Sequence, residues 1–337
     1  MIHLISLKTY DPYGLERSFR SIETLNTWIL TILFCCLGAT LCCHGDESQS
    51  GITEISITSS IDGTDQKALY YKSNSPSPVP LILSLHSWSG DYNQADPLAE
   101  KVIAADWNYI HPDFRGANNN PDACLSEKAV QDLDDAIAYA LREGPVDNTA
   151  VFVVGTSGGG YATLGSYLRT NHPVRLFLAW VPISDLDAWY RESKNRGKKY
   201  AEDIVACCSP FDEYDPHCAL ERSPLYWPMP VLPPGRIELY AGIEDGYTGS
   251  VPISHSLHFF NKLATHFQRP DARVSCEEML ALLTRDVKVD RAAGTLEDRS
   301  IFYKKEIAQA SVTIFYGTHE MLTGYCFERI CAALEER

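Results

Sequence analysis

Ser157 stands in the middle of a short motif whose residue types suit nucleophilic catalysis. The motif reads Gly-Thr-Ser-Gly-Gly from Gly155 to Gly159, and it follows a run of apolar, mostly β-branched residues, 151–154. A strand, a tight turn and a helix beginning near Tyr161 are typical of a nucleophile elbow, in which a strained turn exposes the serine hydroxyl at the end of a strand. The two flanking glycines let the strand and the helix approach each other closely. The motif therefore predicts Ser157 as a nucleophile.

A serine nucleophile needs a base that accepts its proton and an acid that orients the base. His319 lies in the sequence Gly-Thr-His-Glu after one expected strand, and Asp245 follows another. Taken singly, such a histidine is more often structural and such an aspartate is often a turn residue, and Glu244 is the alternative acid. However, the order serine, aspartate, histidine, each after a strand, is that of α/β-hydrolase triads. It predicts Ser157, Asp245 and His319 as the catalytic residues.

Two backbone N–H groups are expected to stabilise the oxyanion that forms when the serine attacks a carbonyl group. One belongs to Gly158, directly after the nucleophile. The other is assigned to Trp88, in the sequence His-Ser-Trp-Ser-Gly at 86–90, because this tight loop follows the apolar run 81–86. In α/β-hydrolases the second donor comes from the loop after a strand that precedes the nucleophile. A plain turn between a strand and a helix is the alternative interpretation.

The elements that must position these residues alternate along the chain. Apolar runs of the kind buried in a parallel sheet are separated by segments long enough for crossover helices. Strands are expected at 52–58, 68–72, 81–86, 107–111, 151–154, 176–181, 236–241, 301–303 and 312–316, and helices include 98–105, 129–142, 272–283 and 325–334. The alternation predicts an α/β-hydrolase fold, a mostly parallel twisted sheet with helices on both faces, in one domain spanning 46–337.

Residues 186–233 replace the simple crossover between two of these strands with some fifty residues rich in aromatic side chains. Such an insertion is expected to lie over the active site as a helical cap that shapes specificity, although a purely structural role is the alternative. The three asparagines Asn118, Asn119 and Asn120 follow another strand end, where they would either contact the substrate or cap the next helix.

Charge and composition limit the partners of the protein. The formal net charge is −15, so most of the surface would repel a phosphate backbone and nucleic acid is not expected as a partner. His255 and His258 have a spacing that suits a metal ion, but no third ligand stands nearby, and we expect neither a metal nor a cofactor. A small peptide or an ester is the expected substrate.

The chain has 11 cysteines, of which four lie in an apolar run near the N-terminus. The other seven are Cys124, Cys207, Cys208, Cys218, Cys276, Cys326 and Cys331. A bridge from Cys207 or Cys208 to Cys218 is the first expectation if the protein is exported, because these residues are close in sequence.

Residues 1–45 have the composition of a targeting segment. Lys8, Arg17 and Arg20 precede the apolar run 28–43, and small residues would permit cleavage before Asp46. We therefore expect a cleaved signal peptide and a secreted or periplasmic protein. An uncleaved N-terminal anchor, with membrane contact through the same segment, is the alternative because the run is close to the minimum length of a span.

From about residue 79 to 334 the chain resembles the α/β-hydrolase superfamily, and more closely the catalytic domain of the prolyl oligopeptidase (S9) family. The resemblance rests on Gly-Thr-Ser-Gly-Gly-Gly-Tyr at 155–161, on Gly-Ile-Glu-Asp followed by Val-Pro within 242–252, and on Gly-Thr-His-Glu at 317–320. It implies a serine peptidase with Ser157 as nucleophile, Asp245 as acid and His319 as base. The chain departs from the family pattern in having no β-propeller and a longer Gly-Tyr-Thr-Gly-Ser segment after the aspartate.

These departures leave two alternatives to a peptidase. A secreted carboxylesterase, such as one that removes acyl groups from a polysaccharide, would suit a single domain with an aromatic cap. A non-catalytic binding protein on a hydrolase scaffold would be favoured if the three residues of the predicted triad did not converge.

Overall fold

The computed structural model describes residues 9–10, 16–17, 51–209 and 213–336 of the chain. Residues 1–48 form a unit of their own, in which β1 (Thr9–Tyr10) pairs antiparallel with β2 (Glu16–Arg17). The predicted apolar run and the cleavage site before Asp46 lie outside the described residues. In the part of the chain that is described, no helix has the length and apolar character needed to cross a membrane.

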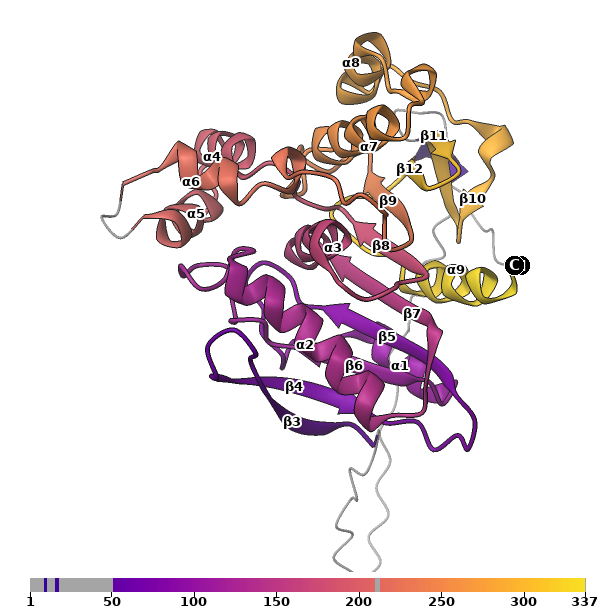
Figure 1. Ribbon diagram of the computed structural model, residues 1–337. Coiled ribbons are helices and arrows are strands. Elements are labelled where there is room, and N and C mark those ends of the chain that lie inside the picture. Colours follow the sequence, from indigo (N-terminus) through magenta and orange to yellow (C-terminus); the bar gives the residue numbers. More distant parts are fainter. Residues whose placement is uncertain (1–8, 11–15, 18–50, 210–212, 337) are drawn as a thin grey trace, which may run out of the picture. The chain divides into compact units, whose positions relative to one another are not determined.

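A ten-stranded sheet forms the centre of the unit that spans residues 49–337 (Figure 1). In the order in which they lie side by side, its strands are β10 (Thr295–Leu296), β11 (Arg299–Ile307), β12 (Ala310–Phe315), β9 (Arg236–Gly242), β8 (Leu176–Trp180), β7 (Val146–Thr156), β5 (Val79–Leu85), β6 (Asn108–Pro112), β4 (Asp65–Tyr71) and β3 (Thr53–Thr58). The strands from β12 to β6 are parallel, and both edges of the sheet are antiparallel.

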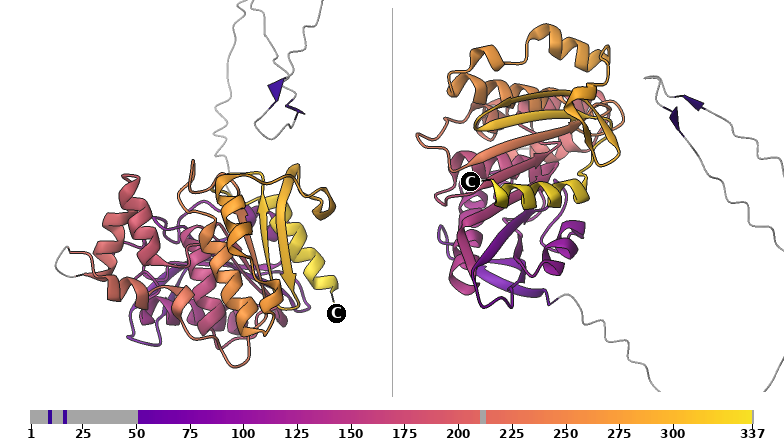
Figure 2. Two further views of the ribbon diagram at one scale, coloured as in Figure 1. Left: turned by 90° about the horizontal axis from the view of Figure 1, so that it is seen from above. Right: turned by 90° about the vertical axis from the view of Figure 1, so that its right-hand side faces the viewer.

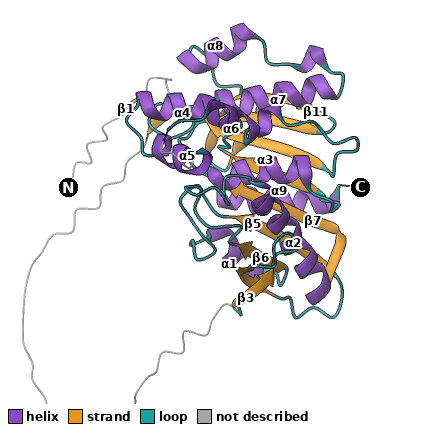
Figure 3. Ribbon diagram, turned by 60° about the vertical axis from the view of Figure 1, so that its left-hand side comes forward, coloured by secondary structure: helices purple, strands orange, loops and turns teal. Residues whose placement is uncertain are grey.

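Helices cover both faces of this sheet (Figures 2 and 3). They are α1 (Pro97–Ala104), α2 (Glu127–Glu143), α3 (Gly158–Arg169), α7 (Ser254–His266), α8 (Cys276–Thr284) and α9 (Thr323–Glu335). Because both faces are covered, the central strands are apolar without alternation: all five residues of β8 are buried. The predicted α/β-hydrolase architecture is confirmed.

Helix α3 begins three residues earlier than the sequence predicts. Its first residue is Gly158 rather than Tyr161, and the backbone N–H of Tyr161 already donates to the carbonyl of Ser157 at 2.8 Å. Three consecutive glycines have low intrinsic helix propensity and therefore favour a longer turn in the sequence. Tertiary packing against β5 and β8 overrides that preference.

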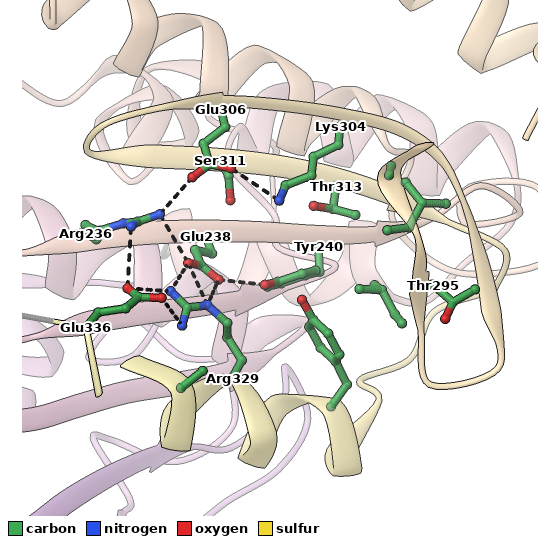
Figure 4. Close-up of a pocket in the computed structure, with 15 residues that line it drawn as sticks. Arg236, Glu238, Tyr240, Thr295, Lys304, Glu306, Ser311, Thr313, Arg329 and Glu336 are labelled. Carbon is green, nitrogen blue, oxygen red and sulfur yellow. Dashed lines mark hydrogen bonds and ion pairs between the residues drawn. The ribbon is translucent and has the colours of Figure 1, made fainter. Parts of the chain in front are cut away.

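The C-terminal helix α9 is anchored to the sheet by a buried ion pair. Glu238 of β9 is 3% exposed, and its carboxylate accepts hydrogen bonds from the Arg329 guanidinium of α9 at 2.8–3.0 Å and from the Tyr240 hydroxyl at 2.6 Å. These side chains converge in a polar cleft of about 310 Å³ between the sheet and the helix (Figure 4). The anchor fixes the position at which the chain leaves β12 and enters α9.

Between β8 and β9 the chain forms α4 (Leu186–Asn195), α5 (Tyr200–Cys208), α6 (Pro216–Glu221) and the short 3₁₀ helix η1 (Pro224–Tyr226). We call this segment the insertion. Its helices project to one side of the sheet in Figure 1. Trp189 of α4 is fully buried, packs edge-on against Trp88 with ring centroids 4.7 Å apart, and stacks on Tyr200 at 4.8 Å. The aromatic residues of the insertion therefore form its contact with the sheet domain.

A disulfide bond also ties the insertion to the sheet domain. It joins Cys207 of α5 to Cys124 in the loop after β6. The expected bridge from Cys207 or Cys208 to Cys218 is wrong, because Cys208 and Cys218 are both free thiols. Cys218, on α6, is instead hydrogen-bonded to the thiol of Cys208. The partners are 83 residues apart, and their pairing depends on how the insertion folds back onto the loop, which proximity in sequence does not reveal.

Removing this disulfide is expected to destabilise the protein. The double variant Cys124→Ala/Cys207→Ala should lose about 2–4 kcal/mol of unfolding free energy, because the unfolded chain regains the entropy of a long open loop. Urea denaturation followed by tryptophan fluorescence measures the change. Reductant should shift the wild-type midpoint but not that of the variant, and Cys331→Ala, which removes a free cysteine, is the control. Equal midpoints for the wild type and the double variant would contradict the prediction.

Candidate active site

Ser157 occupies a strained turn between β7 and α3. Its φ of +60° and ψ of −116° lie outside the usual regions for a residue with a side chain, and its N–H donates to the carbonyl of Trp180 at 2.9 Å. A Cβ atom on Gly155 would stand 2.2 Å from the carbonyl oxygen of Gly159, and one on Gly159 would stand 2.2 Å from that of Leu85. Only glycine fits at either position.

His319 links Ser157 to Asp245. Its Nε2 lies 2.7 Å from the serine Oγ, and its Nδ1 lies 2.7 Å from Oδ2 of the aspartate. This arrangement suits the tautomer in which Nδ1–H donates to the carboxylate while Nε2 accepts from the serine hydroxyl. The three residues follow β7, β9 and β12, whose carboxyl ends meet at one edge of the parallel sheet. The structure thus brings together the three residues that the sequence singles out.

The Asp245 carboxylate is buried and fully engaged. It is 2% exposed, and its second oxygen, Oδ1, accepts the backbone N–H groups of Gly246 at 2.9 Å and Val251 at 3.0 Å. These bonds compensate the loss of water around a buried charge. Glu244, the alternative acid, instead forms an ion pair with Arg285 of the loop after α8, so it is the aspartate that the structure brings to the histidine.

The loop after β5 brings the backbone of Trp88 against the start of α3. A Cβ atom on Gly158 would lie 2.2 Å from the Trp88 nitrogen, so this position also excludes a side chain. The N–H of Trp88 donates to no other group within the described part of the chain. It lies beside the N-terminus of α3, where backbone N–H groups favour negative charge. The two predicted oxyanion donors are therefore neighbours of Ser157.

Asn118 supports this loop, a role that the sequence did not indicate. It is 2% exposed, its N–H donates to the Trp88 carbonyl at 2.8 Å, and its side-chain oxygen accepts the N–H of Cys124 at 2.8 Å. Asn120 caps its own turn by accepting the N–H groups of Asp122 and Ala123. The Asn118 side chain is enclosed and is therefore not accessible to a substrate.

Protein groups engage both ring nitrogens of His255, one of the two histidines with metal-like spacing. The Nδ1 of His255 accepts the N–H of Ser184 at 3.1 Å, and its Nε2 lies 3.1 Å from the Glu192 carboxylate. Burial lowers the pKa of His258. Among the described residues there is no cluster of three or more histidine, cysteine or acidic side chains suited to a metal ion.

The profile of the prolyl oligopeptidase family matches residues 102–278, which is more than half of the chain. The chain belongs to the prolyl oligopeptidase family. The resemblance predicted from the motifs is thereby confirmed, and so is the predicted enzyme class, since this is a family of hydrolases. A comparison with curated proteins finds no match.

Solved structures share the fold at low sequence identity. Pyrococcus horikoshii acylaminoacyl peptidase has 15% identity and a TM-score of 0.56, over 84% of this chain and 40% of that one. A puromycin-hydrolysing peptidase of Mycobacterium tuberculosis has 14% identity and a TM-score of 0.54, over 85% of this chain and 39% of that one. Acetyl xylan esterase 1 from Thermoanaerobacterium sp. JW/SL YS485 has 14% identity and a TM-score of 0.57, over 86% of this chain and 85% of the esterase. The chain thus spans about 40% of the length of these peptidases but most of that of the esterase.

The crowding around the turn predicts a large effect of Gly159→Ala. The new Cβ must push apart the backbones of β5 and α3, so the variant should lose about 3 kcal/mol of unfolding free energy. Chemical denaturation measures this loss. Gly63→Ala is the control: its φ is also positive, at +73°, but no atom lies within 4 Å, and it should lose only about 1 kcal/mol. Similar losses in both variants would show that crowding at Gly159 is not the cause.

Proposed function

We propose that this protein is a serine hydrolase that cleaves a carbonyl compound through Ser157, His319 and Asp245. The observation that carries the proposal is the continuous chain of two 2.7 Å contacts, from the serine oxygen through both imidazole nitrogens to a buried carboxylate. A histidine with a purely structural role in the core would not need a half-buried serine at a strained turn on one side and a buried acid on the other.

The reaction would begin with transfer of the Ser157 proton to Nε2 of His319 as the serine oxygen attacks the carbonyl carbon. Asp245 holds the imidazole in the required tautomer and stabilises the positive charge that the ring acquires. The N–H groups of Gly158 and Trp88 stabilise the oxyanion, and each such donor contributes about 10²–10³-fold to the rate. The imidazolium then gives its proton to the leaving group, which departs and leaves an acyl-serine. Water, activated by the same histidine, hydrolyses this intermediate.

A peptide bond is the first candidate for the bond that is cleaved. Membership of the prolyl oligopeptidase family supports it. The insertion packs on Trp88, in the loop beside the serine, and we propose that it limits the substrate to a small peptide rather than a folded protein. The indole Nε1–H of Trp88 also donates to Asp203 of α5 at 3.1 Å, which holds the insertion on the oxyanion side of the site.

An acyl ester is the second candidate, favoured by one specific observation. The structural match with the acetyl xylan esterase covers 86% of this chain and 85% of the esterase. The match with the acylaminoacyl peptidase covers only 40% of that enzyme. We therefore propose a short acyl group on a carbohydrate as the alternative substrate.

We also retain export as part of the proposal. The disulfide between Cys124 and Cys207 is of the kind that persists in an oxidising compartment, and it supports a secreted or periplasmic location.

Parallel assays of p-nitrophenyl acetate and a proline p-nitroanilide distinguish the candidate functions. Activity on either should fall by about 10⁶-fold in Ser157→Ala, because the nucleophile is lost. The control is Ser166→Ala in the same helix, which removes a buried hydroxyl that has no partner within the described chain and should keep full activity. Cleavage of the anilide supports a peptidase, and cleavage of the ester alone supports an esterase. Turnover that survives Ser157→Ala would refute the assignment and favour a binding protein.

The assignment of the acid predicts different effects at two neighbouring carboxylates. Asp245→Asn should lower kcat by about 10⁴-fold, because an amide favours the wrong histidine tautomer. Glu244→Gln should leave kcat unchanged, because the Glu244 carboxylate pairs with Arg285 while His319 is bound by Asp245. Steady-state kinetics with whichever substrate is turned over measures both. A large loss of kcat in Glu244→Gln with little loss in Asp245→Asn would exchange their roles.

A further inference from the structure

Arg196, at the end of α4, donates hydrogen bonds to the loop that follows Asp245, residues 246–250. Its Nη1 donates to the carbonyls of Gly246 at 2.9 Å and Gly249 at 3.2 Å, and its Nη2 donates to the carbonyl of Ser250 at 2.7 Å. One guanidinium group thus holds three carbonyl oxygens of a five-residue loop. Its Nε donates to the Glu192 carbonyl at 3.0 Å, which fixes the side chain against its own helix.

Trp189 of α4 also donates a hydrogen bond to this loop. The indole Nε1–H of Trp189 donates to the Ser250 carbonyl at 3.0 Å. Trp189 is fully buried and packs on Trp88 and Tyr200, so its position is determined by the core of the insertion. The loop is therefore attached to the insertion at both its first and its last residue.

The loop 246–250 is in direct contact with Asp245 and His319. A Cβ atom on Gly249 would lie 2.2 Å from Oδ1 of Asp245 and 2.8 Å from Cβ of His319. Gly246 is the first residue of the loop, and Val251 directly follows its last residue. The backbone N–H groups of these two residues donate to Oδ1 of Asp245. A shift of this loop would therefore move the carboxylate relative to the imidazole.

From these contacts we infer that Arg196, with Trp189, is a positioning residue for the acid of the triad. The inference rests on the proposed function, since it assumes that Asp245 and His319 act in catalysis. It also connects the aromatic insertion with the longer segment after the aspartate, 246–250, both of which the sequence analysis singled out. The longer loop supplies the carbonyls, and the insertion supplies the guanidinium group that binds them.

The proposed role of Arg196 differs from general support of the fold, because Arg196 acts on the one loop that contacts Asp245 and His319. Three charge-assisted hydrogen bonds on one short loop fix its geometry, and catalytic groups lose about 10²-fold in rate when they are misplaced by about 1 Å. The serine and the two oxyanion donors lie on other elements, and we expect them to stay in place when Arg196 is removed. The loss should therefore appear in kcat while KM stays nearly constant.

The test is steady-state kinetics of Arg196→Met, with the substrate that the wild type turns over. We expect kcat to fall by about 10–10²-fold with little change in KM. Arg196→Lys, which keeps the charge but not the planar fork, should recover part of the loss. The low-field proton resonance of the hydrogen bond between His319 and Asp245 should weaken or shift in Arg196→Met, a change that a distant packing defect would not produce.

The matched control is Arg191→Met, about one turn earlier on the same helix. The exposed Arg191 guanidinium pairs with Asp187, and its removal should leave kcat unchanged. Wild-type kcat in a folded Arg196→Met overturns the inference, as does a rise in KM at constant kcat, which would indicate substrate binding. If Arg196→Met does not fold, Arg196→Lys decides: full kcat and an unchanged proton resonance overturn the inference. Activity that survives Ser157→Ala refutes the proposed function instead, whatever the arginine variants do.

Discussion

The close approach of three backbones around Ser157 is the constraint on which the rest of the site depends. The end of β7, the first turn of α3 and the loop after β5 come so near one another that no Cβ fits at Gly155, Gly158 or Gly159. The same crowding holds the serine at a positive φ, which costs free energy that the surrounding packing must supply. It also sets the Trp88 N–H beside the start of the helix. One packing contact therefore determines where Ser157 and the N–H groups of Gly158 and Trp88 lie.

The other two members of the site reach the same edge of the sheet by a different route. Asp245 and His319 follow β9 and β12, which are adjacent and parallel, so their strand ends lie side by side without any contribution from the turn that carries the serine. What remains to be fixed is the loop between β12 and α9. The buried pair of Glu238 and Arg329 fixes it from the far side by binding α9 to β9. Removing Arg329 would take the nearest charge partner from the Glu238 carboxylate, which is 3% exposed, and this loss is destabilising.

The sequence predicted the parts of the site that depend on local pattern. Strands buried on both faces appear as continuous apolar runs, and the residues after them are placed by topology alone, so Ser157, Asp245 and His319 could be named in advance. The missed features depend on contacts between distant segments. The bond from Cys124 to Cys207 and the enclosure of Asn118 beneath Trp88 arise only when the loop after β6 meets the insertion. No local pattern encodes such a meeting, because its partners are chosen by the packing of side chains.

The insertion is the element through which substrate preference and rate can be linked. An ester and an amide would use the same serine, histidine and acid, so the triad itself does not select between them. The insertion contacts the oxyanion loop through Trp88 and Trp189, and it contacts the acid loop through Arg196. Both loops border the reacting atoms. A change in the insertion would therefore act on the loops beside Ser157 and Asp245, so under the proposed function we expect specificity and catalytic geometry to change together.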